Sequence, residues 1–139
     1  MPFKLNISDK EKAWKLQTES EFLVGKSLGE VIDAKELSAD LAGYELEITG
    51  ASDLAGFPHS KNIAGIGLKK EILTKGWGMR DTREGIRLRK TMRGKILSLS
   101  TTQVNLKVVK SGAKKLAEIF PEQNQPKAKK AAPAPAPTA

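Results

Sequence analysis

The arginines of this 139-residue chain are confined to one short segment. All five lie within fourteen residues, from Arg80 to Arg93. A lysine serves as a solvated point charge, whereas the planar guanidinium of arginine binds phosphate through two parallel hydrogen bonds and stacks on nucleobases. This concentration of arginines therefore indicates a contact surface for a phosphate-rich polymer, with a merely solvated face as the alternative.

The charge of the whole chain is distributed with the same bias. The formal net charge is +8, but residues 1–68 carry −4, residues 69–95 carry +7 and residues 96–139 carry +5. A solubilising surface mixes both signs along its length, so this separation predicts a nucleic-acid partner. The cationic residues expected to bind RNA are Lys69, Lys70, Lys75, Arg80, Arg83, Arg87, Arg89, Lys90, Arg93, Lys95, Lys110, Lys114 and Lys115.

Patterns that would indicate an enzyme are weak. Gly25-Lys26-Ser27 matches the end of a phosphate-binding loop, but Ser20 stands where that loop requires a glycine. His59 is the single histidine and cysteine is absent, so an ordinary structural zinc site cannot be built, and no Ser/His/Asp or Cys/His constellation is readable. We therefore expect no catalytic residue, no metal, no cofactor and no small-molecule substrate.

Two aromatic residues lie on glycine-flanked turns. Phe57 follows Gly56, and Trp77 lies between Gly76 and Gly78. Such side chains can stack on unpaired bases. Packing against the end of the domain is the alternative, and we favour packing for both residues.

The elements that must position these residues are mostly strands. Alternation of apolar and polar residues with a period of two predicts half-buried strands, and it is found at residues 3–7, 13–18, 44–49 and 104–108, with a further strand expected at 67–74. Residues 50–65 are rich in Gly, Ser, Asp, Asn and Pro and predict a long functional loop. Short helical turns are expected at 38–42 and 114–120.

The basic segment itself is predicted to be a long strand. Between residues 86 and 96 the odd positions are mostly cationic and the even positions mostly apolar, which would give a positive ridge of roughly 35 Å at about 3.3 Å per residue. A helix is the competing interpretation, because Leu88, Met92 and Ile96 are spaced by four. Gly85 and Gly94 count against the helix.

Many short strands with glycine-rich turns predict a mainly β fold, a small antiparallel β-barrel with one or two short helices. The barrel domain is expected to span residues 1–118. Residues 119–139 are expected to form an extended, low-complexity Lys/Ala/Pro tail. No apolar run is long enough to cross a membrane, and no signal-peptide pattern is present, which favours a cytoplasmic protein.

Two stretches carry information beyond composition. The first is Gly43-Tyr44-Glu45-Leu46-Glu47-Ile48-Thr49-Gly50-Ala51-Ser52-Asp53, followed by Gly56-Phe57-Pro58. The second is Gly85-Ile86-Arg87-Leu88-Arg89-Lys90-Thr91-Met92-Arg93-Gly94, followed by Gln103-Val104-Asn105-Leu106-Lys107-Val108-Val109-Lys110-Ser111-Gly112. With the opening Phe3-Lys4-Leu5-Asn6-Ile7-Ser8, they closely resemble the S6e family of archaeal and eukaryotic small-subunit ribosomal proteins over about residues 3–118.

The resemblance implies a small β-barrel without catalytic activity that binds 16S-type rRNA in the small ribosomal subunit, with neighbouring ribosomal proteins as further partners. The arginine-rich strand of the family corresponds to Arg87–Arg93. Eukaryotic members end in a long basic helix with phosphorylated serines, whereas this chain ends in an Ala/Pro-rich segment with Thr138 as its last hydroxyl residue, so that regulation is not implied here.

Two alternatives remain at the level of the sequence. One is a free RNA-binding module or translation factor that acts off the ribosome, which has almost the same sequence content. The other is a membrane-surface protein that uses its lysine-rich tail, but no amphipathic helix or lipidation motif accompanies those lysines.

Overall fold

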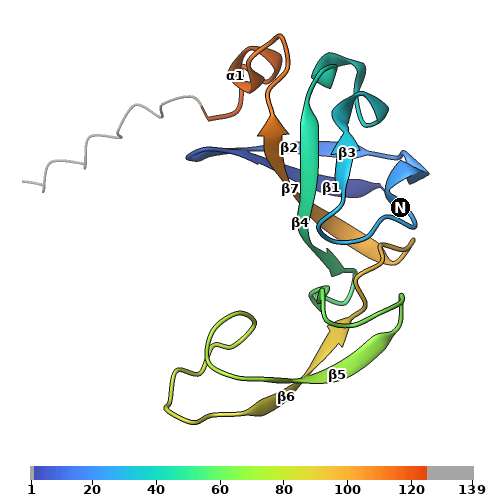
Figure 1. Ribbon diagram of the computed structural model, residues 1–139. Coiled ribbons are helices and arrows are strands. Elements are labelled where there is room, and N and C mark those ends of the chain that lie inside the picture. Colours follow the sequence, from blue (N-terminus) through green and yellow to red (C-terminus); the bar gives the residue numbers. More distant parts are fainter. Residues whose placement is uncertain (1, 125–139) are drawn as a thin grey trace, which may run out of the picture.

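A computed structural model describes residues 2–124. Its main body is a five-stranded sheet with the strand order β2-β1-β7-β4-β3. A separate two-stranded hairpin, β5-β6, projects from one end of this body (Figure 1). The mainly β architecture expected from the sequence is therefore confirmed.

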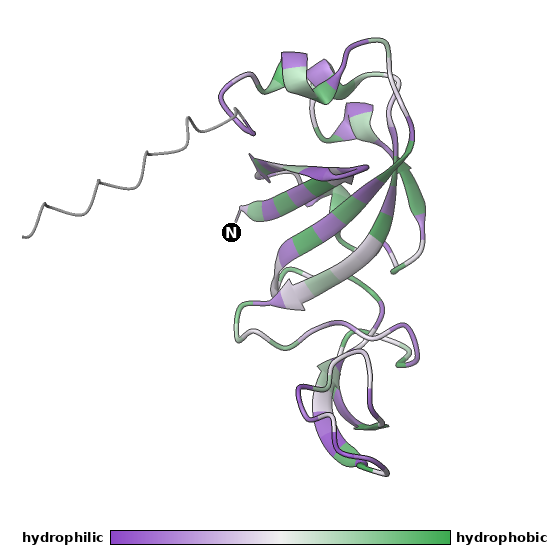
Figure 2. Ribbon diagram, turned by 90° about the vertical axis from the view of Figure 1, so that its left-hand side faces the viewer, coloured by the Kyte–Doolittle hydropathy of each residue, from purple (hydrophilic) through white to green (hydrophobic). Residues whose placement is uncertain are grey.

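The sheet forms because its strands carry apolar side chains on one face. Strand β1 (Phe3–Asp9) buries Phe3, Leu5 and Ile7, and the alternation of buried and exposed residues recurs in β2 (Lys12–Thr18), β4 (Glu45–Asp53) and β7 (Thr101–Lys110). Figure 2 shows this alternation as bands of hydrophilic and hydrophobic residues along the strands. The short strand β3 (Val31–Asp33) completes the sheet beside β4.

The expected antiparallel barrel needs two corrections. Strand β1 pairs with β7 in the parallel direction, in the register Leu5 with Val104 and Ile7 with Leu106. The two sheets also do not close on each other, so the described residues form an open sheet with a hairpin rather than a barrel. A parallel pair between strands so distant in the chain leaves no local sequence signal, because no tight turn joins them.

Short helical elements contribute to the core of the main body through Leu23, Leu41 and Leu116. They are three 3-10 turns, η1 (Glu21–Leu23), η2 (Ala34–Glu36) and η3 (Ala39–Leu41), and one α-helix, α1 (Leu116–Ile119). The turn η3 and the helix α1 confirm the two helical turns predicted from the sequence. Gly43 follows η3 with a φ of +89°, a conformation that favours glycine at the end of a helical turn.

The projecting hairpin pairs β5 (Leu68–Leu73) with β6 (Leu88–Arg93). It has a small core of its own, formed by Ile63, Leu73 and Met92 with Met79 packed against them. This cluster is separate from the core under the large sheet. The hairpin is thus supported by its own apolar contacts and by its connection to the body.

Strand β6 is shorter than predicted. An ideal Cβ on Gly94 would lie 1.9 Å from the carbonyl oxygen of Gly65, so the backbone there comes closer than any other residue allows. After Gly94, the backbone N–H of Lys95 donates to the carbonyl of Ile63, and the N–H of Leu97 donates to the carbonyl of Lys26. The chain therefore leaves the hairpin at Gly94 and enters the body, which ends the expected cationic ridge at Arg93.

Strand β4 is longer than predicted. It continues through Asp53, so only part of the expected 50–65 loop is irregular. The irregular remainder includes Pro58 and His59, which make isolated bridges to Ser52 and Arg93. This segment therefore joins the hairpin to the sheet.

Ordered contacts continue beyond residue 118, the expected end of the folded domain. Ile119 and Phe120 pack against the main core. The side-chain amide of Gln123 accepts from the backbone N–H of Lys15 and donates to the carbonyl of the same residue, at 2.6 and 2.8 Å. Asn124 donates to the carbonyl of Ala13, so these two residues cover the outer edge of β2. The lysines of the expected tail lie outside the described residues.

No helix within the described part of the chain is long and apolar enough to cross a membrane.

Candidate nucleic-acid interface

The cationic residues predicted from the sequence are almost all exposed. Twelve of the thirteen have exposed side chains, including every lysine of the set. Within residues 69–95, only Arg83 and Arg93 form an ion pair with another described residue. The bridge from Arg83 to Asp81 is 2.8 Å long but is largely exposed, where such a pair contributes little to stability.

The two faces of the hairpin differ in composition. In the observed register, Leu68 lies opposite Arg93, Lys70 opposite Thr91 and Ile72 opposite Arg89. Because side chains alternate across a strand, these six share one face, whereas Leu73 and Met92 lie on the other, which faces the small core and also carries the exposed Lys69 and Lys90. The face that carries Lys70 and Arg89, here called the cationic face, also exposes two aliphatic side chains, Leu68 at 46% and Ile72 at 56%.

Arg93 differs from the other arginines of the segment. Its Nε donates to Asp53 Oδ2 at 2.9 Å, and its Nη1 donates to the carbonyl of Ile66 at 3.2 Å. The side chains of Arg93 and Asp53 are only 16% and 2% exposed. The structure therefore places this guanidinium inside the joint between hairpin and body rather than on the cationic face.

Electrostatics at this joint favour a charged Asp53. Burial alone would raise the pKa of its carboxyl group, but the backbone N–H of Phe57 and the guanidinium of Arg93 outweigh burial and lower the pKa below its usual range. The N–H of Phe57 lies 2.8 Å from Asp53 Oδ1. Asp53 was not among the predicted site residues, and its place at the end of the Gly43–Asp53 stretch was its only signal.

His59 belongs to the same joint and is a buried structural residue. Its Nδ1 donates to the carbonyl of Gly94 at 2.6 Å, and its Nε2 accepts from the hydroxyl of Thr101 at 3.1 Å. Burial lowers the pKa of His59, the hydrogen bond to Gly94 works in the opposite direction, and the charge of Arg93 lowers it further. Both ring nitrogens of His59 are therefore engaged in contacts within the joint between the hairpin and the sheet.

The cationic residues form two groups rather than one. Those of the hairpin project from one end of the sheet, whereas Lys110, Lys114 and Lys115 follow β7 to the other end, beside α1 (Figure 1). Lys110 lies 3.7 Å from Glu45 in an exposed pair. The predicted site is therefore divided between two distant surfaces.

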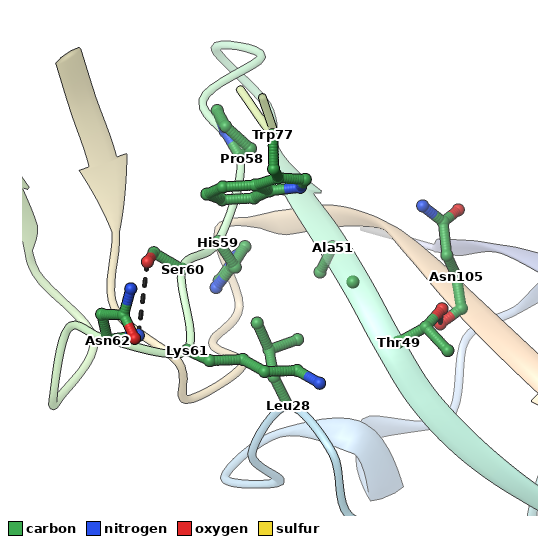
Figure 3. A pocket seen from close by; sticks show the side chains of 11 residues that line it. Leu28, Thr49, Ala51, Pro58, His59, Ser60, Lys61, Asn62, Trp77 and Asn105 are labelled. Atoms are coloured by element: carbon green, nitrogen blue, oxygen red, sulfur yellow. Dashed lines mark hydrogen bonds between the residues drawn. The ribbon is translucent and has the colours of Figure 1, made fainter. Parts of the chain in front are cut away.

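The two predicted aromatic residues are both accessible. Phe57 is 36% exposed and Trp77 is 60% exposed. Trp77 lies on the curled connection between β5 and β6 and lines a pocket of about 490 Å³ between that connection and the sheet (Figure 3). Lys61 lines the same pocket; sequence analysis missed this residue, and its only signal was a single charge within an expected functional loop.

Two patterns with an enzymatic appearance have structural explanations. The backbone N–H groups of Gly25 and Lys26 donate to the carbonyls of Leu97 and Leu23, and that of Ser27 donates to Glu30. No N–H of this tripeptide therefore remains for a phosphate. Among residues 2–124, no three His, Cys, Asp or Glu side chains gather closely enough to hold a metal ion.

Comparison with known proteins defines the class to which this arrangement belongs, that of ribosomal proteins. The model of the family "Ribosomal protein S6e" matches residues 3–121, which is most of the chain. The chain belongs to the ribosomal protein S6e family, whose members are structural proteins and not enzymes. The sequence resemblance and the expected lack of enzymatic activity are thereby confirmed.

Individual relatives support this assignment. The chain is 38% identical to small ribosomal subunit protein eS6 of Methanothermobacter thermautotrophicus over 123 residues, covering 86% of this chain and 96% of the relative. It is 36% identical to the protein of the same name from Methanosphaera stadtmanae, with coverages of 90% and 98%. The corresponding protein of Nanoarchaeum equitans is 40% identical, with coverages of 86% and 90%.

Proposed function

We propose that this protein is a structural component of the small ribosomal subunit in the cytoplasm and that it binds small-subunit rRNA through the cationic face of the β5–β6 hairpin. One observation carries this proposal. The hairpin projects from the body and presents exposed Lys and Arg side chains that form almost no ion pairs with the described residues. The relatives are named small ribosomal subunit protein eS6, and this name supports the small ribosomal subunit as the assembly in which the protein works.

The mechanism is electrostatic. Each Lys or Arg that contacts a phosphate releases condensed counterions, so affinity falls steeply as salt increases. The deep major groove of A-form RNA hides the base edges, so a cationic ribbon recognises the shape and backbone of the helix. Leu68 and Ile72, between the cations, contact the sugars of the shallow minor groove in this arrangement.

The second cationic group extends the proposal to two RNA segments. Lys110, Lys114 and Lys115 lie at the end of β7 opposite the hairpin. A rigid sheet between two phosphate-binding ends fixes the distance between the RNA helices that it touches. The contribution of the protein is then to hold rRNA architecture and to offset phosphate repulsion.

The test is a salt series of the affinity for small-subunit rRNA. The variant Lys70→Ala/Arg87→Ala/Arg89→Ala removes three exposed hairpin charges, and Arg93 is left in place because it holds Asp53. We expect the slope of log affinity against log salt to flatten by about two to three relative to the wild type.

The matched control removes the same charge elsewhere. Lys4, Lys12 and Lys35 are exposed, lie in the acidic N-terminal half and form no ion pair with described residues. Their triple Ala variant is expected to keep the wild-type slope. Equal flattening in both variants would show a general charge effect, and no flattening in the hairpin variant would mean that this face is only solvated.

Residence on the ribosome is tested separately. We expect the wild-type protein to sediment with the small subunit in high salt, as an integral component does. Release at moderate salt would favour a factor that acts off the ribosome.

A further inference from the structure

The pocket beside Trp77 lies between the hairpin and the sheet. In Figure 3 the indole of Trp77 lies along one side of this pocket, and the side chain of Lys61 runs along the opposite side with Leu28. Thr49 and Asn105, from β4 and β7, lie toward one end. Its volume of about 490 Å³ is within the range of sites for small organic groups.

Trp77 is held in place although its side chain is exposed. Gly76 and Gly78 have φ values of +132° and +77°, which L side chains rarely adopt. An ideal Cβ on Gly78 would lie 3.0 Å from Leu73 Cδ1 and 3.1 Å from Met92 Cε, so the backbone of the turn packs directly onto the core of the hairpin. The chain thus presents the aromatic face of Trp77 from a fixed backbone. This reduces the conformational entropy that the protein loses when a ligand binds.

The polar groups around the indole have unused hydrogen-bonding capacity. Asn105 Oδ1 accepts from Gln103, but its Nδ2 donates to no described residue. Asn62 donates through Nδ2 to Glu71, and its Oδ1 accepts from no described residue. The Nζ of Lys61 forms no ion pair with the described part of the chain. One donor, one acceptor and one cation therefore line a pocket that has an aromatic wall.

These groups match the parts of one nucleotide. An aromatic wall stacks on a base, amide groups bond to the base edge, and an ammonium group binds a phosphate. The strand leading to and from such a nucleotide would meet Lys75 and Arg80, which bracket Trp77 in sequence and are exposed. A purely apolar ligand would leave all of these charges unused.

We infer that this pocket receives a single unpaired nucleotide of RNA, whose base stacks on Trp77 while Lys61 contacts its phosphate. The inference rests on the proposed rRNA-binding function and adds a second mode of recognition to it. The hairpin binds the phosphates of a helix, and the pocket selects a helix that carries an extruded base. Extrusion exposes the base that a regular A-form duplex hides.

The experiment compares two RNAs with the full chain at one salt concentration. One RNA is a perfect duplex, and the other is the same duplex with one additional unpaired adenosine. We expect the bulged RNA to bind about tenfold more tightly, the factor that one base–aromatic stack supplies. Since Trp14 is buried and Trp77 is exposed, fluorescence quenching by the bulged RNA reports on Trp77.

Variants assign the preference to the pocket. Trp77→Ala is expected to reduce the tenfold preference to less than twofold and to leave the affinity for the perfect duplex unchanged. Trp77→Phe should retain part of the preference, because a smaller aromatic ring still stacks. Phe57→Ala, which removes an exposed aromatic side chain outside this pocket, is the matched control and should retain all of it.

The possible failures are distinguishable. If the wild type binds both RNAs equally, or if Trp77→Ala keeps the preference, the pocket does not take a nucleotide, while binding of the perfect duplex still supports the hairpin as an RNA-binding surface. If free adenosine monophosphate binds as tightly as the bulged RNA and quenches Trp77 equally, the ligand is a free nucleotide and the assignment to RNA is overturned. If the wild type binds neither RNA, the proposed function itself fails.

Discussion

His59 has the largest consequence for pH at the scale of a single residue. In the folded protein its Nδ1 donates to Gly94 and its Nε2 accepts from Thr101, and burial, the leading cause, lowers its pKa from the ordinary 6.5. Protonation turns Nε2 into a donor, so the Thr101 hydroxyl that donates to Nε2 would have to turn its hydrogen away. The folded state therefore binds a proton less readily than the unfolded chain does.

The first prediction concerns this linkage. Because the folded pKa is depressed, the unfolded state binds more protons just below pH 6.5, and the free energy of unfolding should decrease as the pH falls below that value. The decrease approaches about 1.4 kcal/mol per pH unit between the two pKa values. Urea unfolding of the wild type at pH 7.5, 6.5 and 5.5 measures it.

His59→Gln is the control for this measurement. It lowers stability at every pH but removes the single histidine, so its free energy of unfolding should be nearly constant over this range. A variant that lost stability as steeply as the wild type would assign the titration to another group.

The sequence indicated which cations the hairpin carries, but not which of them has a structural role. Composition alone marked Arg87, Arg89 and Lys90 as exposed cations. It could not separate Arg93 from them, because the odd-position pattern is identical for all three arginines. The difference comes from Asp53, which lies 40 residues away in sequence and reaches Arg93 only through the tertiary fold.

At the scale of the element, the β5–β6 hairpin is fixed to the body at its base. Arg93 bonds to Asp53 of β4 and to the carbonyl of Ile66, and the backbone of Arg93 donates to Pro58. These contacts set the direction in which the cationic face points. Arginine thus fixes the hairpin at Arg93, while the exposed Arg87 and Arg89 are left for the proposed contact with phosphate.

The second prediction tests this anchor. Arg93→Ala leaves the buried carboxylate of Asp53 without its cation, which should lower the free energy of unfolding by about 3 kcal/mol. Arg89→Ala, from the exposed part of the same strand, should change it by less than about 0.5 kcal/mol. Urea unfolding of both variants gives the comparison, and equal small losses would show that Arg93 is not an anchor.

The element scale also shows where strand prediction failed. The alternation at residues 86–96 is real, but β6 ends at Arg93 because Gly94 lies against the backbone of Gly65. Strand β4 is longer than predicted because Gly50 and Ser52 remain paired with β7 across register shifts. Both errors arise where long-range backbone contacts override the local pattern.

At the scale of the whole molecule, the last described residues complete the sheet. Gln123 and Asn124 make three hydrogen bonds to the outer edge of β2. An open edge strand is a template for pairing with another chain, and natural proteins cover such edges. The third prediction compares chains that end at Asn124 and at Pro121.

Both truncated chains should fold, since the main core lies before these residues. The shorter chain should lose about 1–2 kcal/mol of stability, because exposed hydrogen bonds contribute little each, and it should self-associate more readily. Thermal unfolding and sedimentation velocity measure the two effects. Identical behaviour of the two chains would mean that the edge contacts have no protective role.

The mainly β class of the molecule was predictable from the sequence, whereas the open form of its sheet was not. Local alternation identified nearly every strand, and the family motifs identified the relationship. The parallel pairing of β1 with β7 was not predictable, because residues such as Ile7 and Leu106 signal a strand but not its neighbour or direction. That pairing makes the sheet mixed rather than antiparallel, and the sheet is open because its edge strands β2 and β3 do not pair with each other.

The position of β7 has a further consequence during synthesis. It is the central strand of the large sheet, yet it is the last of the strands to leave the ribosome that makes it. Until residues 101–110 emerge, the β1–β2 pair and the β3–β4 pair have no common neighbour, and their apolar faces remain uncovered. Contacts between residues so distant in the chain form slowly. A newly made chain therefore passes through an interval in which the two strand pairs are not yet joined. The basic residues 69–95 have then already emerged from the ribosome and are able to bind RNA before the sheet is complete.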